Sequence, residues 1–355
     1  MIFTRAAVIA FASSAALAVV LASSLAAADG SDSDGDGVPD SLEDATQRTV
    51  AVSVAGNQFS ASSHLGTAPV EDQFDLMYRS GAFTVWYGQA GGTTSTYGLE
   101  LLSLVAWNDS NANGRIDPGE IVWSTPLAPT AFADSPVAAS TRVDPDGGRI
   151  FGFEMRSRDG NTTLNVTMAQ RFTRVDSATL TPMEARVEIS MTSAAVPAGS
   201  KLGIQFRMSC SVRPYLMEHS WDQDHGFAAD EHAVNVTEHA GDRSATSFFS
   251  WSNTAKVGGA ATPVELAKGL GYSNPYDLTL VAGQGPSPDG TKVVQRFTLG
   301  VYSAVYEIRR VATPPVQADP LLYAGTIAAV SVLVAVSIVF ANRRRKNRED
   351  PGRKP

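Results

Sequence analysis

Acidic side chains recur at short, regular intervals close to the N-terminus. In the twelve residues from Asp32 to Glu43, carboxylates occupy positions 1, 3, 5, 9 and 12, and position 6 is Gly37. Calcium binds six to eight oxygen atoms at about 2.3–2.6 Å, and this spacing wraps the chain around such an ion while the glycine permits the sharp turn. The spacing therefore predicts a calcium site with the following ligands: Asp32, Asp34, Asp36, the carbonyl of Val38, Asp40 and Glu43.

The centre of this stretch is the segment Asp-Gly-Asp-Gly-Val-Pro-Asp at residues 34–40. It resembles the calcium repeats of thrombospondin type 3 modules and of their bacterial relatives. The resemblance covers a dozen residues and implies calcium binding alone, because those modules usually carry several repeats and this chain shows one. The alternative interpretation is a solvated acidic linker.

A second twelve-residue stretch, residues 109–120, repeats the same geometry with two amide side chains in place of carboxylates. Gly114 stands at its turn position. With three charged ligands against five, this site is expected to bind calcium more weakly than the first. An Asp/Asn/Gly-rich hairpin turn is the alternative. The predicted ligands are Asp109, Asn111, Asn113, the carbonyl of Arg115, Asp117 and Glu120.

The second stretch is similar to the calcium loops of EF-hand and dockerin proteins, which implies calcium as its ligand. Its flanks differ from that family, because residues 101–107 and 121–123 have the composition of strands, whereas an EF-hand loop lies between helices. We therefore expect a calcium loop between two strands. Neither stretch offers an arrangement of catalytic groups, so the expected role of calcium is to stiffen loops.

Four of the five histidines fall within one acidic stretch, residues 218–242. Imidazole and carboxylate groups together suit zinc, which could activate a water molecule for hydrolysis. The spacing matches no HExxH or His-x-His pattern, so we favour a solvated polar loop and keep a zinc site as the alternative. The histidines concerned are His219, His225, His232 and His239.

Three further sets of residues have chemical potential. Cys210 lies on the apolar side of an alternating segment, so we expect a buried, unreactive thiol. Trp86 and Trp123 could stack on sugars, although an aromatic residue in a strand more commonly packs in the core. Glycosylation sequons lie at Asn161, Asn165 and Asn235.

The segments that must position these sites alternate between apolar and polar side chains. Val187, Ile189 and Met191 are apolar, while the residues between them are polar, which is typical of half-buried β-strands. Similar segments recur along the chain with no long helical pattern between them. The sequence therefore predicts a mainly β fold, a large antiparallel β-sandwich over residues 46–312. Two smaller sandwiches divided near residues 194–200 are the alternative.

The two ends of the chain have the patterns of export and membrane anchoring. Residues 1–28 combine one early arginine, an apolar run and small residues, as a signal peptide does; an uncleaved anchor is the alternative. Residues 321–341 carry no charge and would form a helix of roughly 31 Å, long enough for one transmembrane span; a buried core helix is the alternative. The remaining segments are the first calcium stretch at residues 29–45, a Pro-rich linker at residues 313–320 and a basic cytoplasmic tail at residues 342–355.

The basic cluster after the apolar segment belongs on the cytoplasmic side of a membrane. We therefore expect a single-pass cell-membrane protein of type I orientation, with the ectodomain, residues 29–320, outside the cell. An alternative is that the tail is processed after export.

The composition excludes two classes of protein. The net charge is −8, and seven of the 28 basic residues lie in residues 343–354, so the rest of the chain is strongly acidic. Nucleic-acid binding requires a basic surface, so we exclude it. A single cysteine excludes a disulfide scaffold.

We expect a calcium-binding, non-enzymatic surface protein that serves adhesion, envelope structure or ligand binding. One alternative is a surface hydrolase or carbohydrate-active enzyme that uses the His/Asp-rich residues 218–242. Another is a receptor that senses an extracellular ligand and signals through a partner.

Overall fold

In the computed structural model, every described residue belongs to the segment Met1–Val311. The described residues are 32–33, 40–64, 72–89, 92–113, 116–144, 147–175, 178–192, 200–217, 231–268, 274–282 and 292–302. The signal peptide predicted at residues 1–28, the linker, the transmembrane segment and the tail all lie outside these ranges. Within them, no helix combines the length and the apolar character that a membrane span requires.

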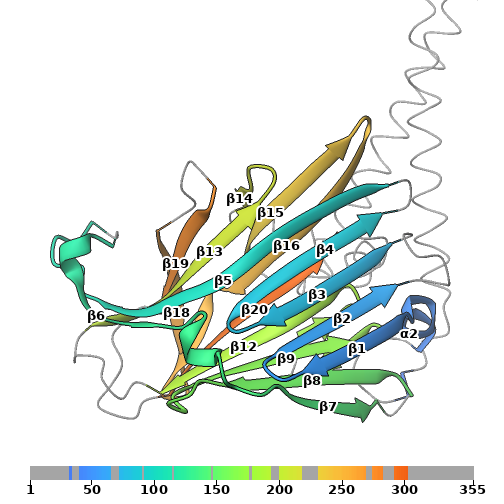
Figure 1. The fold of residues 1–355 in the computed structure, drawn as a ribbon, viewed down its shortest axis with the longest axis horizontal. Coiled ribbons are helices and arrows are strands. Elements are labelled where there is room, and N and C mark those ends of the chain that lie inside the picture. Colours follow the sequence, from blue (N-terminus) through green and yellow to red (C-terminus); the bar gives the residue numbers. More distant parts are fainter. Residues whose placement is uncertain are drawn as a thin grey trace, which may run out of the picture. The chain divides into compact units, whose positions relative to one another are not determined.

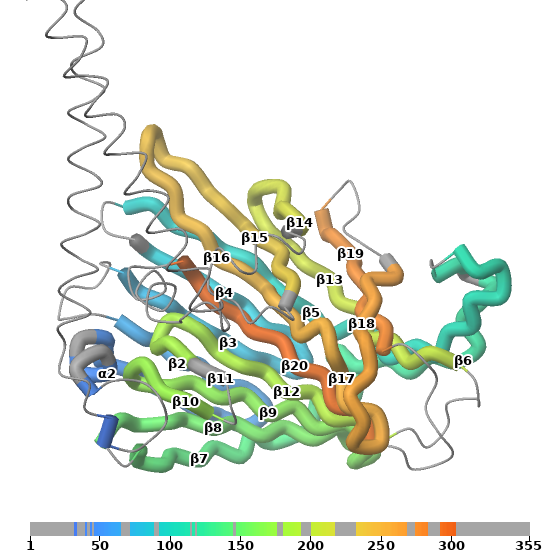
Figure 2. Tube along the Cα trace, turned by 180° about the vertical axis from the view of Figure 1, so that it is seen from behind, coloured from blue at the N-terminus to red at the C-terminus, as the bar shows by residue number. Residues whose placement is uncertain are grey.

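Long antiparallel strands make up most of the structure, which confirms the prediction of a mainly β fold. The strands form two large sheets (Figures 1 and 2). The first sheet begins with a meander in which each strand pairs with the next, from β1 to β5, and β5 then pairs with β13, which pairs with β19, which pairs with β18. A further strand, β6 (Ile121–Pro126), pairs with the C-terminal part of β5. The bounds of the other strands of this sheet are β1 (Thr49–Ala55), β2 (Gln58–His64), β3 (Gln73–Arg79), β4 (Ala82–Gln89), β5 (Thr93–Trp107), β13 (Lys201–Cys210), β19 (Tyr276–Ala282) and β18 (Ala260–Lys268).

The second sheet is built in the same antiparallel way. Its order is β7, β8, β9, β12, β20, β16, β15 and β14. The bounds are β7 (Ala138–Val143), β8 (Arg149–Arg156), β9 (Thr162–Ala169), β12 (Glu184–Thr192), β20 (Lys292–Val301), β16 (Arg243–Ser252), β15 (Glu231–Ala240) and β14 (Tyr215–Met217). The short β17 (Thr254–Val257) pairs with both β18 and β20 and so links the two sheets.

Aromatic side chains join the two sheets face to face. Phe59 on β2 stacks on Phe153 on β8 with 4.1 Å between ring centroids, and Phe206 on β13 lies 5.3 Å from Phe249 on β16. Most of the buried apolar side chains form one continuous cluster, which runs in sequence from Phe59 to Val301. Strands from both sides of residues 194–200 occur in each sheet, and β12 and β13, which flank that segment, lie in different sheets.

One strand is buried more completely than its alternation predicts. Val187, Ile189 and Met191 of β12 are buried as expected, but Arg186 on the opposite face is also only 7% exposed. Its Nη1 donates a 2.6 Å hydrogen bond to the carbonyl oxygen of Val175. Val175 ends β10 (Thr173–Val175), which pairs with β11 (Ala178–Leu180) in a separate two-stranded ribbon. The interpretation of β12 as a half-buried strand is therefore wrong, because Arg186 on its polar face is enclosed by contact with this ribbon.

Candidate functional site

The loop at residues 109–120 connects the paired ends of β5 and β6. Both flanks are strands, as the sequence predicts. Among the described residues of the loop, the only helical turn is η1 (Pro118–Glu120), a single 3-10 turn before β6. The amide nitrogen of Asn108 donates a 3.0 Å hydrogen bond to the carbonyl oxygen of Glu120, which closes the base of the loop. Figure 1 shows the loop projecting from the ends of these two strands. The loop is thus a β-hairpin connection and not part of a helix–loop–helix unit.

Four of the predicted ligand side chains converge within this loop. Nδ2 of Asn111 and Nδ2 of Asn113 both donate to Oδ2 of Asp117, at 2.9 and 3.0 Å. The amide nitrogen of Asn113 donates to Oδ1 of Asp109 at 2.9 Å. It also donates to Oδ1 of Asn111 at 3.0 Å. Ala112 has a φ of 54°, so the chain turns sharply between these residues. Asp109, Asn111, Asn113 and Asp117 therefore surround one small volume, while Arg115 lies outside the described residues.

Glu120 is held by donors from the other end of the loop. Its Oε1 accepts hydrogen bonds from the backbone nitrogen of Ser110 at 3.0 Å, from the hydroxyl of Ser110 at 2.9 Å and from the backbone nitrogen of Asn111 at 3.2 Å. Its Oε2 accepts from Nε1 of Trp107 at 3.2 Å. These bonds lower the pKa of the Glu120 carboxyl, and the bond from Trp107 contributes most. Both oxygens thus serve loop closure, a role that spacing alone does not indicate.

A small apolar cluster separate from the main core supports the loop. Trp107, Ala267 and Val281 are buried in this cluster, and Ile116 from the loop packs against it. Nζ of Lys201 lies 5.1 Å from the centre of a Trp107 ring and also pairs with Glu265 at 2.7 Å. The loop is therefore fixed at its base by packing and by hydrogen bonds to Glu120.

The first predicted calcium stretch is described at three of its six ligand positions. Oδ1 and Oδ2 of Asp40 accept hydrogen bonds from the backbone nitrogen and the hydroxyl of Ser33, at 2.8 and 2.7 Å. This contact brings the beginning of the stretch back to its ninth position. Asp32 is described and exposed. Asp34, Asp36 and the carbonyl of Val38 lie outside the described residues.

The end of this stretch is helical and docked on the second sheet. The helix α2 (Asp40–Thr46) includes Glu43, whose side chain is 0% exposed and whose Oε1 lies 3.8 Å from Nε of Arg171. Oγ1 of Thr46 accepts a 3.0 Å hydrogen bond from the backbone nitrogen of Phe172. The predicted ligand Glu43 therefore takes part in anchoring the N-terminal segment to the β9–β10 connection.

The described histidines do not converge. His232 and His239 lie seven residues apart on β15, which puts them on opposite faces of the strand and roughly 23 Å apart. His219 and His225 lie outside the described residues. Across the part of the chain that the structure describes, no three His, Cys, Asp or Glu side chains gather as a metal-binding group. The cluster in the 109–120 loop consists of two carboxylates and two amides.

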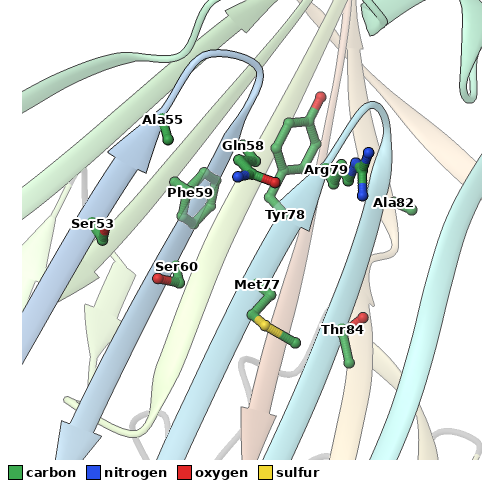
Figure 3. Close-up of a pocket in the computed structure, with 10 residues that line it drawn as sticks. All are labelled: Ser53, Ala55, Gln58, Phe59, Ser60, Met77, Tyr78, Arg79, Ala82 and Thr84. Carbon is green, nitrogen blue, oxygen red and sulfur yellow. The ribbon is translucent and has the colours of Figure 1, made fainter.

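A shallow groove lies on the outer face of the first sheet, across β1 to β4. The pairing registers place Ser53, Ser60, Met77 and Thr84 in one row across these strands, as Figure 3 shows. A neighbouring part of the groove, with a volume of about 720 Å³, contains the next row: Ala51, Ser62, Asp75, Trp86 and Thr96.

The side chain of Trp86 lies close over the backbone of Gly88 in this groove, since a Cβ at residue 88 would overlap its ring. Beside it, Nε2 of Gln73 donates to both carboxylate oxygens of Asp75 at 2.9 Å. Trp86 is half-buried, whereas the adjacent Tyr87 is buried. The sequence marks Trp86 as a candidate but does not single out Gln73, Asp75 and Met77, although the alternation of β3 places all three on one face.

The three sequons differ in exposure. Asn161 is exposed, Asn165 is partly exposed and Asn235 is only 7% exposed. The Asn235 side chain also accepts a 3.3 Å hydrogen bond from the hydroxyl of Tyr302. Asn235 has no room for a glycan in this packing, while Asn161 is accessible.

No protein-family model matches the chain, and no curated protein matches it. The geometry of the loop, the helix and the groove is therefore the basis on which a function can be proposed.

Proposed function

We propose that the 109–120 loop binds a calcium ion and that the protein is a calcium-binding surface protein without enzymatic activity. The observation that supports this function best is the convergence of Asp109, Asn111, Asn113 and Asp117 on one small volume. Carboxylate and amide oxygens with the carbonyl of Arg115 form a set of ligands that suits a hard cation. Rotation of the two amide groups would turn their oxygens toward the ion.

Glu120 has two candidate roles in this proposal. In its first role, Glu120 keeps its hydrogen bonds from Ser110, Asn111 and Trp107 and so organises the loop. Water molecules would then complete the coordination of the ion. If Glu120 instead turns to ligate calcium directly, it must exchange these four hydrogen bonds for contacts with the ion. The first role preserves the geometry of the structure, and we favour it.

The first calcium stretch is proposed as a second site, with Asp32, Asp34, Asp36, Val38 and Asp40 as its ligands. Glu43 would then connect this site to Arg171 and the sandwich. An ion that binds only the folded form stabilises that form by mass action, so bound calcium would fasten the N-terminal segment and the β5–β6 hairpin to the body.

The location at the cell surface is also a proposal. It is supported by the signal-like residues 1–28 and by the uncharged residues 321–341 followed by a basic cluster. A hydrolase that uses zinc receives less support, because His232 and His239 lie far apart on β15. Membrane fractionation with protease treatment of intact cells would test the expected orientation: protection of the ectodomain would contradict it.

Calorimetric titration of the full chain with calcium tests the proposed sites. Asp109→Ala and Asp117→Ala should each remove the binding event of the 109–120 loop and leave the N-terminal event, which Asp32→Ala should weaken instead. Asp134→Ala is the matched control, because Asp134 is exposed and pairs with Arg158 outside both stretches. Heats that are the same for the wild type and for Asp109→Ala would overturn the assignment of this loop.

The groove supports saccharide binding as a second candidate function. A pyranose ring presents an apolar face of C–H groups that packs on an aromatic ring, and its hydroxyls bond to amide and carboxylate groups. Trp86, Gln73 and Asp75 supply these two kinds of contact. Retardation of the protein in polysaccharide-containing native gels, reduced by Trp86→Ala but not by Trp123→Ala, is the expected result; equal effects of the two variants would exclude the groove.

A further inference from the structure

The strand β1 is an edge strand of the first sheet as far as the described residues extend. It pairs with β2 and with no other strand among the described residues. Its sequence, Thr-Val-Ala-Val-Ser-Val-Ala, contains neither a charged residue nor a proline. Soluble proteins usually protect an exposed edge with a charge, a proline, a bulge or a covering segment, because an open row of backbone groups pairs readily with another chain. The edge of β1 therefore has the chemistry of a pairing surface.

The apolar face of β1 extends beyond the core. The register places Val54 opposite Phe59 and Val52 opposite Ala61, so these side chains share the inner face of the sheet. Phe59 and Ala61 are 2% and 1% exposed, whereas Val52 and Val54 are 40% and 38% exposed. The second sheet thus covers the inner face of β2 but not that of β1. Val52 and Val54 on β1 are therefore in contact with solvent.

The opposite sheet ends in a similar way. Its edge strand β7 pairs with β8 alone among the described strands, and every residue of β7 is exposed. Among the described residues, the two edge strands β1 and β7 are therefore both largely exposed on this side of the sandwich.

The sequence of β1 is complementary to itself in the antiparallel direction. Rotation about Val52 places Val50 opposite Val54, Ala51 opposite Ser53 and Thr49 opposite Ala55. Valine then faces valine along the inner face, small side chains face each other on the outer face, and no like charges meet. Directly opposed β-branched pairs of this kind stabilise antiparallel sheets. This symmetry favours an identical strand as the partner over an unrelated peptide.

We propose that two copies of this chain associate through β1, with the strands antiparallel and a two-fold axis at Val52. Such a contact is isologous, and it joins the first sheets of the two copies into one continuous sheet. The exposed valines of each copy cover those of the other. The outer groove, which Ala51 and Ser53 border, would then continue across the junction.

Cysteine cross-linking in the full chain tests both the contact and its register. The axis places Val52→Cys directly opposite its own counterpart, with about 4.5–5.5 Å between the two Cα atoms. A disulfide spans this Cα separation. Val54→Cys lies two residues from the axis and about 13 Å from its counterpart, which is too far for a disulfide. The one native cysteine, Cys210, is buried and should contribute little background.

The expected result is a covalent dimer with Val52→Cys, none with Val54→Cys alone, and a dimer again when Val50→Cys and Val54→Cys are combined. Val143→Cys on β7 is the matched control for random collision, because Val143 is 66% exposed on the other edge. Equal cross-linking of Val52→Cys and Val143→Cys, or of Val52→Cys and Val54→Cys, would overturn the proposal.

Sedimentation velocity of the detergent-solubilised full chain gives a readout without an engineered bond. The wild type should sediment as a dimer and Val52→Lys as a monomer, since two ammonium groups would then face each other on the axis. The circular dichroism spectrum of Val52→Lys should match that of the wild type, because residue 52 is outside the core. A wild type that is monomeric at the same concentration, or a Val52→Lys chain that stays dimeric, would contradict the proposal.

Discussion

At the scale of single residues, Glu120 couples the stability of the 109–120 loop to pH. Its hydrogen bonds from Trp107, Ser110 and Asn111 favour the charged carboxylate and lower its pKa below the ordinary 4.5. A group whose pKa is lower in the folded state stabilises that state above its unfolded pKa, and this contribution is lost as the pH falls through the folded pKa. The contribution of Glu120 is therefore complete at neutral pH and disappears below pH 4.5.

We predict that Glu120→Gln lowers the unfolding free energy at neutral pH and that this deficit shrinks in acid. Denaturant unfolding of both proteins on either side of pH 4.5 measures the effect. Trp107→Phe removes the largest contributor while it retains an aromatic ring, so it should reproduce part of the change. A deficit that is constant with pH would show that Glu120 does not act through its charge.

Cys210 gives a second prediction at this scale. Burial, together with the smaller effect of the negative charge of Glu238, raises the pKa of its thiol to about 11. At a pH three units below that pKa, about one thiol in a thousand is ionised. Alkylation by iodoacetamide near pH 8 should therefore be slow in the native protein and fast after unfolding. Mass spectrometry of the alkylated chain measures this ratio. Native labelling at the rate of the denatured chain would contradict the prediction of an inert core thiol.

At the scale of elements, α2 depends on a few contacts with the β9–β10 connection. Thr46 is 1% exposed, and its hydroxyl accepts from Phe172 while it donates to the carbonyl oxygen of Glu43 at 3.1 Å. We predict that Thr46→Val costs about 1–3 kcal/mol, because the buried amide of Phe172 then has no acceptor there. Thermal and denaturant unfolding measure the loss.

Thr141→Val on the exposed strand β7 is the control for this substitution and should change stability by less than about 0.5 kcal/mol. If Thr46→Val is as mild as this control, α2 is not anchored through its hydroxyl.

The sequence predicts which segments form strands better than it predicts which residues pack around each strand. Alternation identified β9 and β12 because a sheet face repeats every two residues. The enclosure of Arg186 was not predictable, since it depends on the β10–β11 ribbon. Likewise, the spacing of Asp109, Asn111, Asn113 and Asp117 indicated a common centre, but the hydrogen bonds of Glu120 depend on where the fold places Trp107.

At the scale of the whole molecule, Phe297 connects the two sheets at the centre of the sandwich. Its ring lies 6.3 Å from Phe83, 5.6 Å from Phe206 and 5.6 Å from Phe249. We predict that Phe297→Ala destabilises the fold by about 3–5 kcal/mol, as large cavities in a core do. Denaturant unfolding followed by fluorescence and by circular dichroism should show one shared transition for both probes. Two separate transitions would favour two independent sandwiches.

The arrangement of the strands is the part of the fold that a single sequence does not determine. Strand β5 pairs with β13 about a hundred residues later, and β20 pairs with β12 on one edge and with β16 and β17 on the other. Such pairings depend on long-range packing, which local alternation does not encode. The position of the 109–120 loop at the end of β5 and β6 was predictable because its predicted ligands and both strands are close in sequence.

Terbium luminescence gives the sharpest test of ion binding by the 109–120 loop, because terbium binds in place of calcium and emits when a nearby tryptophan transfers its excitation energy. Trp107 lies at the base of the loop, with Nε1 3.2 Å from Oε2 of Glu120. Excitation of tryptophan in the full chain should produce terbium emission that calcium displaces. Asp109→Ala should abolish this emission, Asp32→Ala should retain it, and Trp107→Phe should reduce it without preventing binding. Emission that is absent from the wild type, or unchanged in Asp109→Ala, would contradict a calcium site in this loop.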